Sequence, residues 1–226
     1  NGNKGFTFKG SVLLNNGTVN PAIFSFDSTS TLSGSGSFAV TNDMYVGANG
    51  NVTLLSDVNF AVADNFFFLS GATMNPNGFT INFTQGALTL NTGATIAASG
   101  LFKTQNAITF NLRAGSAFNV PLKVTSGSTV AATDLSSPYL GKLFGDVTID
   151  TGGTLGSYMT FFNSNFSLDV YGNVTNNGTI IASTSANKVF SFYGSTFINN
   201  GLVSHPYFSF RSVSTLTGTG TFTSNT

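Results

Sequence analysis

Few residues in this chain of 226 could perform acid–base, nucleophilic or metal chemistry, because only 7% of its positions are charged. All eight acidic residues are aspartates, cysteine is absent, and His205 beside Pro206 is the single histidine. A zinc site needs several His or Cys ligands, and a Ser–His–Asp triad would depend on this one histidine. We therefore interpret His205 as a replaceable turn residue and expect no metal ion, no cofactor and no catalytic residue.

Asp146 and Asp150, with Lys142 nearby, are the best candidates for chemistry on a polysaccharide. Glycoside hydrolysis needs two carboxylates on either side of the bond to be cut, and a polysaccharide lyase would need a basic residue. We favour the simpler interpretation, in which residues 146–150 form a strand whose even-numbered residues face water. The tyrosines that would offer stacking surfaces for sugars on the same side are Tyr139, Tyr158 and Tyr171.

Calcium and nucleic acid are also disfavoured as ligands. Calcium takes six to eight oxygens, whereas pairs such as Asp57 and Asp64 are isolated and no Asp-x-Asp run occurs. The eight basic residues are scattered and the net charge is zero, so we expect no nucleic-acid partner. No apolar run approaches the roughly 18 residues of a membrane span, so we expect none in this segment.

The elements that would position these residues are short strands. Apolar and polar residues alternate in runs such as Phe79-Thr80-Ile81-Asn82-Phe83 and Ile108-Thr109-Phe110-Asn111-Leu112. Alternation with period two indicates strands, and glycine-rich or Asn-Gly turns separate the runs. Because the chain is rich in Gly, Asn, Ser and Thr and has no Glu, we expect no helix.

The chain repeats itself at two lengths. Residues 3–38 match residues 187–222 without a gap, with 20 identities in 36 positions. We therefore expect one long unit over 3–186, of about 184 residues, and the start of a second copy over 187–226. A Gly-small-Thr-apolar pattern recurs about every 20 residues, as at Gly71, Gly93, Gly115 and Gly194, with single threonines at 31, 53, 73, 95, 154, 196 and 215.

These periods predict a single continuous all-β parallel β-solenoid over 1–226, right-handed, with about 20 residues per coil and roughly 11 coils. The threonines at equal spacing would form a structural ladder. An antiparallel sandwich is the alternative, since turns such as Asn16-Gly17 and Asn77-Gly78 suit hairpins. The near-constant spacing of the glycine marks favours the solenoid, because a sandwich with unequal loops has no reason to keep it.

Three segments resemble the β-helical repeats of large secreted prokaryotic surface proteins, such as autotransporter passengers and filamentous-haemagglutinin-like adhesins. They are Gly-Ala-Thr-Met-Asn-Pro-Asn-Gly at 71–78, Asn-Asn-Gly-Thr-Ile at 176–180 and Leu-Ser-Gly-Ser-Gly-Ser-Phe at 32–38. The resemblance covers the whole chain and implies an extracellular structural or adhesive role, but it carries over no site residue.

The expected function is that of a non-enzymatic fibre, filament or cell-surface stalk, extracellular or at the cell surface, with possible adhesion to surface glycans. Neither end resembles a cap, so we expect a window on a longer array, continued by the same chain or by end-to-end self-association. The alternative is a carbohydrate-binding or polysaccharide-cleaving β-helix with a groove on one face.

Overall fold

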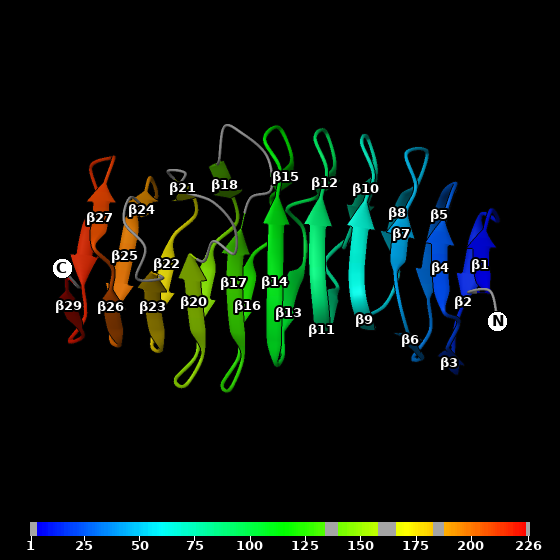
Figure 1. Cartoon of the computed structure of the whole chain (residues 1–226), viewed down its shortest axis with the longest axis horizontal. Helices are drawn as coiled ribbons and strands as arrows, with labels where there is room; N and C mark the ends of the chain where they lie inside the picture. The colour runs from blue at the N-terminus through cyan, green and yellow to red at the C-terminus, as the bar shows by residue number, and fades with distance from the viewer. Residues whose placement is uncertain (1–3, 134–139, 158–165, 183–187, 225–226) are drawn as a thin grey trace.

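The computed structural model describes residues 4–133, 140–157, 166–182 and 188–224. Within these ranges every element is a strand, and the paired strands run parallel, so the antiparallel alternative is wrong. Figure 1 shows the coils following one another along the long axis, with β1 at one end and β29 at the other. The chain is a parallel β-solenoid.

The solenoid has three faces, which the chain visits in the order first, second, third. The first face consists of β1 (Gly5–Phe8), β4 (Ile23–Phe26), β7 (Met44–Val46), the second parts of β9 (Val58–Phe68) and β11 (Thr80–Leu90), β14 (Ala107–Leu112), β17 (Thr129–Thr133), β20 (Thr154–Ser157), β23 (Thr179–Ala182), β26 (Leu202–Ser204) and β29 (Thr221–Thr223). The second face is a separate ten-stranded sheet of β2 (Val12–Leu14), β5 (Thr29–Ser33), β8 (Asn51–Leu54), β10 (Thr73–Asn75), β12 (Thr95–Ile96), β15 (Ala117–Phe118), β18 (Leu140–Leu143), β21 (Phe166–Val170), β24 (Lys188–Phe192) and β27 (Tyr207–Phe210).

The third face joins the first in one 19-stranded sheet, because β9 and β11 run through the corner between them. It consists of β3 (Thr18–Val19), β6 (Ser37–Val40), the first parts of β9 and β11, β13 (Leu101–Thr104), β16 (Leu122–Val124), β19 (Val147–Ile149), β22 (Val174–Asn176), β25 (Thr196–Asn199) and β28 (Thr215–Thr217).

Coils are slightly longer than the spacing of the glycine marks predicts. Equivalent positions lie roughly 22 residues apart, as for Met44 and its partner Phe66. Two coils are longer still, because Phe118 pairs with Leu143 and Leu143 with Val170. Within the described residues, eleven strands nevertheless stack on the first face, which agrees with the roughly 11 coils expected.

The core is a column of apolar side chains from all three faces, and phenylalanine supplies its largest members. Strand β4 shows the pattern, since Phe24 and Phe26 are buried while Ile23 and Ser25 are partly exposed. Side chains in successive coils meet along the axis: the rings of Phe38 and Phe60 have centroids 5.3 Å apart. Alternation in sequence thus becomes an apolar interior and a polar exterior.

The expected single column of threonines is wrong. Thr31 pairs with Thr53 on the second face, but Thr53 then pairs with Asn75 and not with Thr73. Thr154 lies on the first face, and Thr196 and Thr215 pair on the third. The threonines are therefore shared among several short ladders.

Candidate functional site

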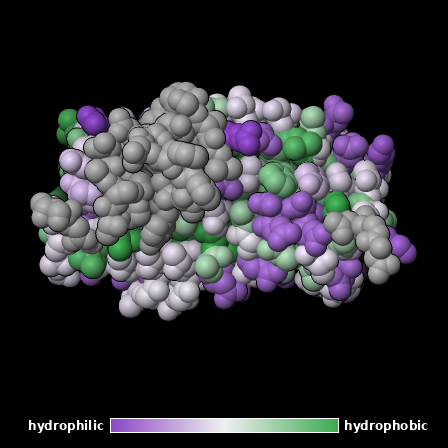
Figure 2. Space-filling view, in the orientation of Figure 1, coloured by the Kyte–Doolittle hydropathy of each residue, from purple (hydrophilic) through white to green (hydrophobic). Residues whose placement is uncertain are grey.

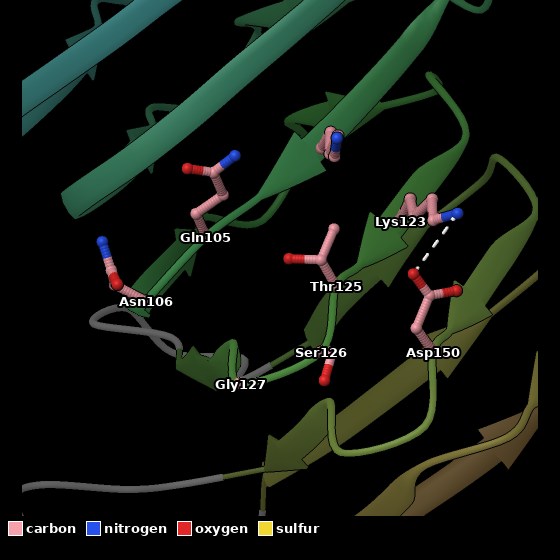
Figure 3. Close-up of a pocket in the computed structure, with 8 residues that line it drawn as sticks. Gln105, Asn106, Lys123, Thr125, Ser126, Gly127 and Asp150 are labelled. Atoms are coloured by element: carbon pink, nitrogen blue, oxygen red, sulfur yellow. Dashed lines mark ion pairs between the residues drawn. The ribbon is translucent and has the colours of Figure 1, made fainter.

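A polar groove lies at the corner between the third and first faces, where strands β13, β16 and β19 end. It has a volume of about 520 Å³ and is lined by Lys103, Gln105, Asn106, Lys123, Thr125, Ser126, Gly127 and Asp150. Figure 3 shows Gln105 and Asn106 on one side of Thr125, and Lys123 with Asp150 on the other. The lining residues come from three successive coils, so stacking of the coils creates the groove.

Buried hydroxyl groups hold the backbone beneath the groove. The hydroxyls of Thr104 and Ser128, both fully buried, lie 2.9 Å apart, and Ser128 Oγ donates to the carbonyl oxygen of Asn106 at 2.9 Å. Thr125 Oγ1 donates to the carbonyl oxygen of Thr104 at 2.6 Å. Asn106 Nδ2 donates to the carbonyl oxygen of Thr84 at 2.7 Å and has a left-handed backbone with φ of 60°. These hydrogen bonds fix the backbone that lines the groove.

The groove carries an excess positive charge. Lys103 and Lys123 occupy the same register on neighbouring strands, a placement in which like charges repel. Lys123 Nζ lies 3.3 Å from Asp150 Oδ2, whereas Lys103 has no carboxylate within ion-pairing distance among the described residues. Two ammonium groups and one carboxylate beside exposed amide and hydroxyl groups suit a carboxylate-bearing or other anionic ligand with several hydroxyls.

The acidic pair predicted from the sequence is separated by the structure. Asp146 precedes β19 and Asp150 follows it, so their Cα atoms lie about 13 Å apart along an extended strand. Asp146 Oδ1 accepts the backbone N–H of Asn173 at 2.8 Å, and Asp150 pairs with Lys123 instead of Lys142. Carboxylates of glycosidases lie about 5–10 Å apart. In this structure each of the two carboxylates is engaged with a partner of its own.

The tyrosines proposed as sugar-stacking surfaces have different outcomes. Tyr139 and Tyr158 lie outside the described residues. Tyr171 stacks between Phe144 and Tyr193, with ring centroids 5.0 Å and 4.6 Å away, and Lys142 Nζ lies 5.8 Å from its ring. Because these rings cover one another's faces, the column is a stabilising ladder that offers no open aromatic face at Tyr171.

His205 is more deeply buried than a replaceable turn residue would be. Its exposed fraction is 3%, its Nδ1 accepts the backbone N–H of Tyr207 at 3.3 Å, and its ring packs against that of Phe190 in a T-shaped contact.

In the described ranges no three His, Asp or Glu residues gather as metal ligands. Asp57, one of the predicted isolated acids, accepts the backbone N–H of Thr80. None of the described segments forms a helix that could cross a membrane.

Both ends of the solenoid leave core side chains uncovered. At the N-terminal end Phe6 is 51% exposed, and at the C-terminal end Leu216 and Phe222 are 50% and 43% exposed. Figure 2 shows hydrophobic atoms at the C-terminal end of the molecule, at the left of the view. These residues point inward in their coils, as Phe6 opposite the buried Phe24 shows, so their exposure reflects the absence of a covering coil.

The sequence did not predict that Lys103 and Lys123 would meet in a groove. Lys103 and Lys123 are separated along the chain by close to one coil, and that spacing could have revealed them. The same spacing does not predict that Asp150 lies beside these lysines, because the coil between Thr125 and Asp150 is longer than the regular coil.

The fold and its surface define a β-helical repeat region of stacked coils. Comparison of the chain with protein-family models, with curated proteins and with solved structures finds no match.

Proposed function

We propose that this chain is a non-enzymatic structural protein that builds an extracellular fibre, filament or cell-surface stalk from tandem β-solenoid units. The observation that carries the proposal is the uncovered core at both ends, where Phe6 and Phe222 are 51% and 43% exposed. Parallel strands at an end also leave a row of backbone groups unpaired, which favours addition of a further coil. That coil comes from continuation of the same chain or from end-to-end self-association.

Composition supports the extracellular part of the proposal. Only 7% of positions are charged and Asn, Ser and Thr are abundant, a composition typical of secreted surface proteins that are exposed to proteases. Its coils resemble those of autotransporter passengers and filamentous-haemagglutinin-like adhesins, so the finer proposal is a secreted prokaryotic surface protein with an adhesive role.

The test is the assembly state of the purified 226-residue chain, followed by electron microscopy and sedimentation velocity. We expect rods longer than one molecule, and we expect Phe222→Lys to shorten them because it places an ammonium group in the joint. Leu55→Lys is the matched control, since Leu55 is 48% exposed on the side of the solenoid. A chain that remains monomeric at every concentration would contradict end-to-end association.

A second candidate function is binding of an acidic polysaccharide, and the groove with Lys103 and Lys123 favours it. Titration with polygalacturonate should give binding that weakens as salt increases, because salt screens exposed charges. Lys103→Gln should lower the affinity about two- to fivefold, as expected for an exposed charge pair. Lys142→Gln, away from the groove, should leave the affinity unchanged.

Neutral dextran is the control ligand, and equal binding of dextran and polygalacturonate would argue against an acidic specificity. Cleavage is tested separately by measuring new reducing ends or unsaturated products in the same mixtures. Loss of such products in Asp146→Asn would support the enzymatic alternative, whereas binding without products supports a purely binding groove.

A further inference from the structure

The two copies of the repeated sequence form the same local structure. Residues 187–222 match residues 3–38 at an offset of 184, and equivalent side chains make equivalent hydrogen bonds. These bonds are Ser30 Oγ to Gly10 O (2.8 Å) and Ser214 Oγ to Gly194 O (2.9 Å), and Asn15 Nδ2 to Ser37 O (3.1 Å) and Asn199 Nδ2 to Thr221 O (3.1 Å).

Aromatic contacts repeat as well. The rings of Phe6 and Phe24 stack with centroids 5.4 Å apart, and the equivalent rings of Phe190 and Phe208 stack at 5.0 Å. The matched sequences therefore specify matched coils.

The two copies nevertheless lie on different faces. Strands β1 and β4 belong to the first face, whereas their equivalents β24 and β27 belong to the second. Eight turns lead from β1 to β23 on the first face, and β24 follows one face later. One long unit therefore advances the solenoid by eight turns and one face, because its length is not a whole multiple of the common coil length.

Each copy shows what covers the other copy's open edge. Phe6 is 51% exposed, but its equivalent Phe190 is 1% exposed because Leu168 of β21 lies opposite it. Phe222 is 43% exposed, but its equivalent Phe38 is 1% exposed beneath Phe60. A coil with the structure of residues 166–182 would therefore cover the N-terminal edge. A coil with the structure of residues 44–62 would cover the C-terminal edge.

We infer that successive copies of this long unit join as β21–β23 join β24–β26 here, with each copy turned by one face of the solenoid. The inference rests on the proposed fibre function and names the partner of both ends, which is a further copy of the unit. At about 4.8 Å per coil, one unit rises about 40 Å, and the pattern returns to the same face after three units, about 120 Å.

This arrangement distributes every surface feature around the fibre. The groove with Lys103 and Lys123 would recur on the three sides in turn, one groove per unit. A ligand that spans neighbouring grooves would have to wind around the fibre, so a fibre of this kind has no single binding side.

The test uses a tandem protein of four copies of residues 3–186 followed by residues 187–226. Because the chain has no cysteine, Ser70→Cys in chosen copies gives single attachment points for gold labels on an exposed turn. Labels in copies one and two should lie about 40 Å apart along the axis and a third of a turn apart around it, relative to the coil twist in the same images.

The matched control carries the labels in copies one and four, which should lie about 120 Å apart on the same side. A straight rod with the labels of copies one and two on one side would overturn the turned junction and leave the fibre proposal standing. Separate globules in place of a rod would contradict both.

The junction can also be tested in the 226-residue chain itself. Tyr171 and Tyr193 stack at 4.6 Å across it, so Tyr171→Cys with Tyr193→Cys should form a disulfide on mild oxidation, detected by mass. Ile181→Cys with Tyr193→Cys should not, since these positions lie on different faces. The opposite outcome would show β24 stacked over β23 and would overturn the inference.

Discussion

At the scale of single residues, position in the coil decides what a side chain contributes. Lys123 and Asp150 form an ion pair whose side chains are 37% and 33% exposed, and such pairs stabilise folded proteins by about 0–1 kcal/mol. Phe60 is fully buried, and removing a buried phenylalanine ring costs about 3–5 kcal/mol. Stability therefore comes from the inward residues, and the outward ones are free to serve a ligand.

Gly34 is required by the corner where it lies. Its φ is 110°, and a Cβ there would collide with the backbone carbonyl of Asn15 in the preceding coil. Gly34→Ala should lower the free energy of unfolding by about 1–3 kcal/mol, measured by urea denaturation. Gly17→Ala is the control, because a Cβ at Gly17 meets nothing within 4 Å, and it should change stability by less than about 0.5 kcal/mol.

Tyr45 should give a pH dependence. Burial raises its pKa, and the charge of Asp43 and the hydrogen bond to Asp43 Oδ2 at 3.1 Å add to the effect. The folded protein holds the hydroxyl proton more tightly than the unfolded chain. This contribution to stability is therefore fully present below about pH 10 and is lost as the pH rises through the raised pKa.

Ultraviolet titration of the tyrosines should show a component that ionises above the pKa of free tyrosine. Tyr45→Phe keeps the stacking on Phe67 and should remove part of that component. An unchanged titration curve in this variant would contradict the assignment. Tyr193, whose pKa is also raised, first by burial and then by Asp169, accounts for a further part.

At the scale of elements, strands depend on the buried polar groups at their corners. The hydroxyls of Thr104 and Ser128 satisfy each other where β13 ends and β17 begins. Ser128→Ala should cost about 1–3 kcal/mol in thermal or urea unfolding, because it leaves buried polar groups without their partner. Ser126→Ala, on an exposed residue two positions away, should stay within about 0.5 kcal/mol. Similar losses in both variants would contradict a supporting role for the buried pair.

Sequence periodicity predicted the strands and their stacking but not their phase. The marks at Gly71, Gly93 and Gly115 all precede strands of the second face, whereas the mark at Gly194 precedes β25 of the third face. A glycine corner has the same chemistry at all three corners, so the residues themselves do not reveal which one they form. The two longer coils after Phe118 shift the phase.

Unequal coil length also limited what the sequence could predict about the candidate site. Lys103 and Lys123 fall within one regular coil and were predictable neighbours, but Asp150 joins them across a longer coil. The sequence did not predict the stacking of Phe144, Tyr171 and Tyr193 either, because these residues are separated by coils of unequal length. Stacking can be predicted where coil length is constant and fails where it changes.

At the scale of the whole molecule, each coil contacts chiefly the coils before and after it. Such quasi-one-dimensional proteins gain stability as a sum of coils and of interfaces between neighbours. Covering an end adds the stability of one more interface between coils. For this reason the uncovered core at Phe6 and Phe222 favours addition of a further coil.

The direction of the hydrogen bonds between coils has a mechanical consequence. These bonds run along the axis, because strands of successive coils lie side by side across it, as β24 and β27 do. A force that pulls the two ends apart therefore loads the interfaces in series, and the end coil peels off first. Unfolding one coil of about 22 residues releases about 70–80 Å of extended chain. A fibre of this kind would therefore lengthen in steps under a sudden load, one coil at a time.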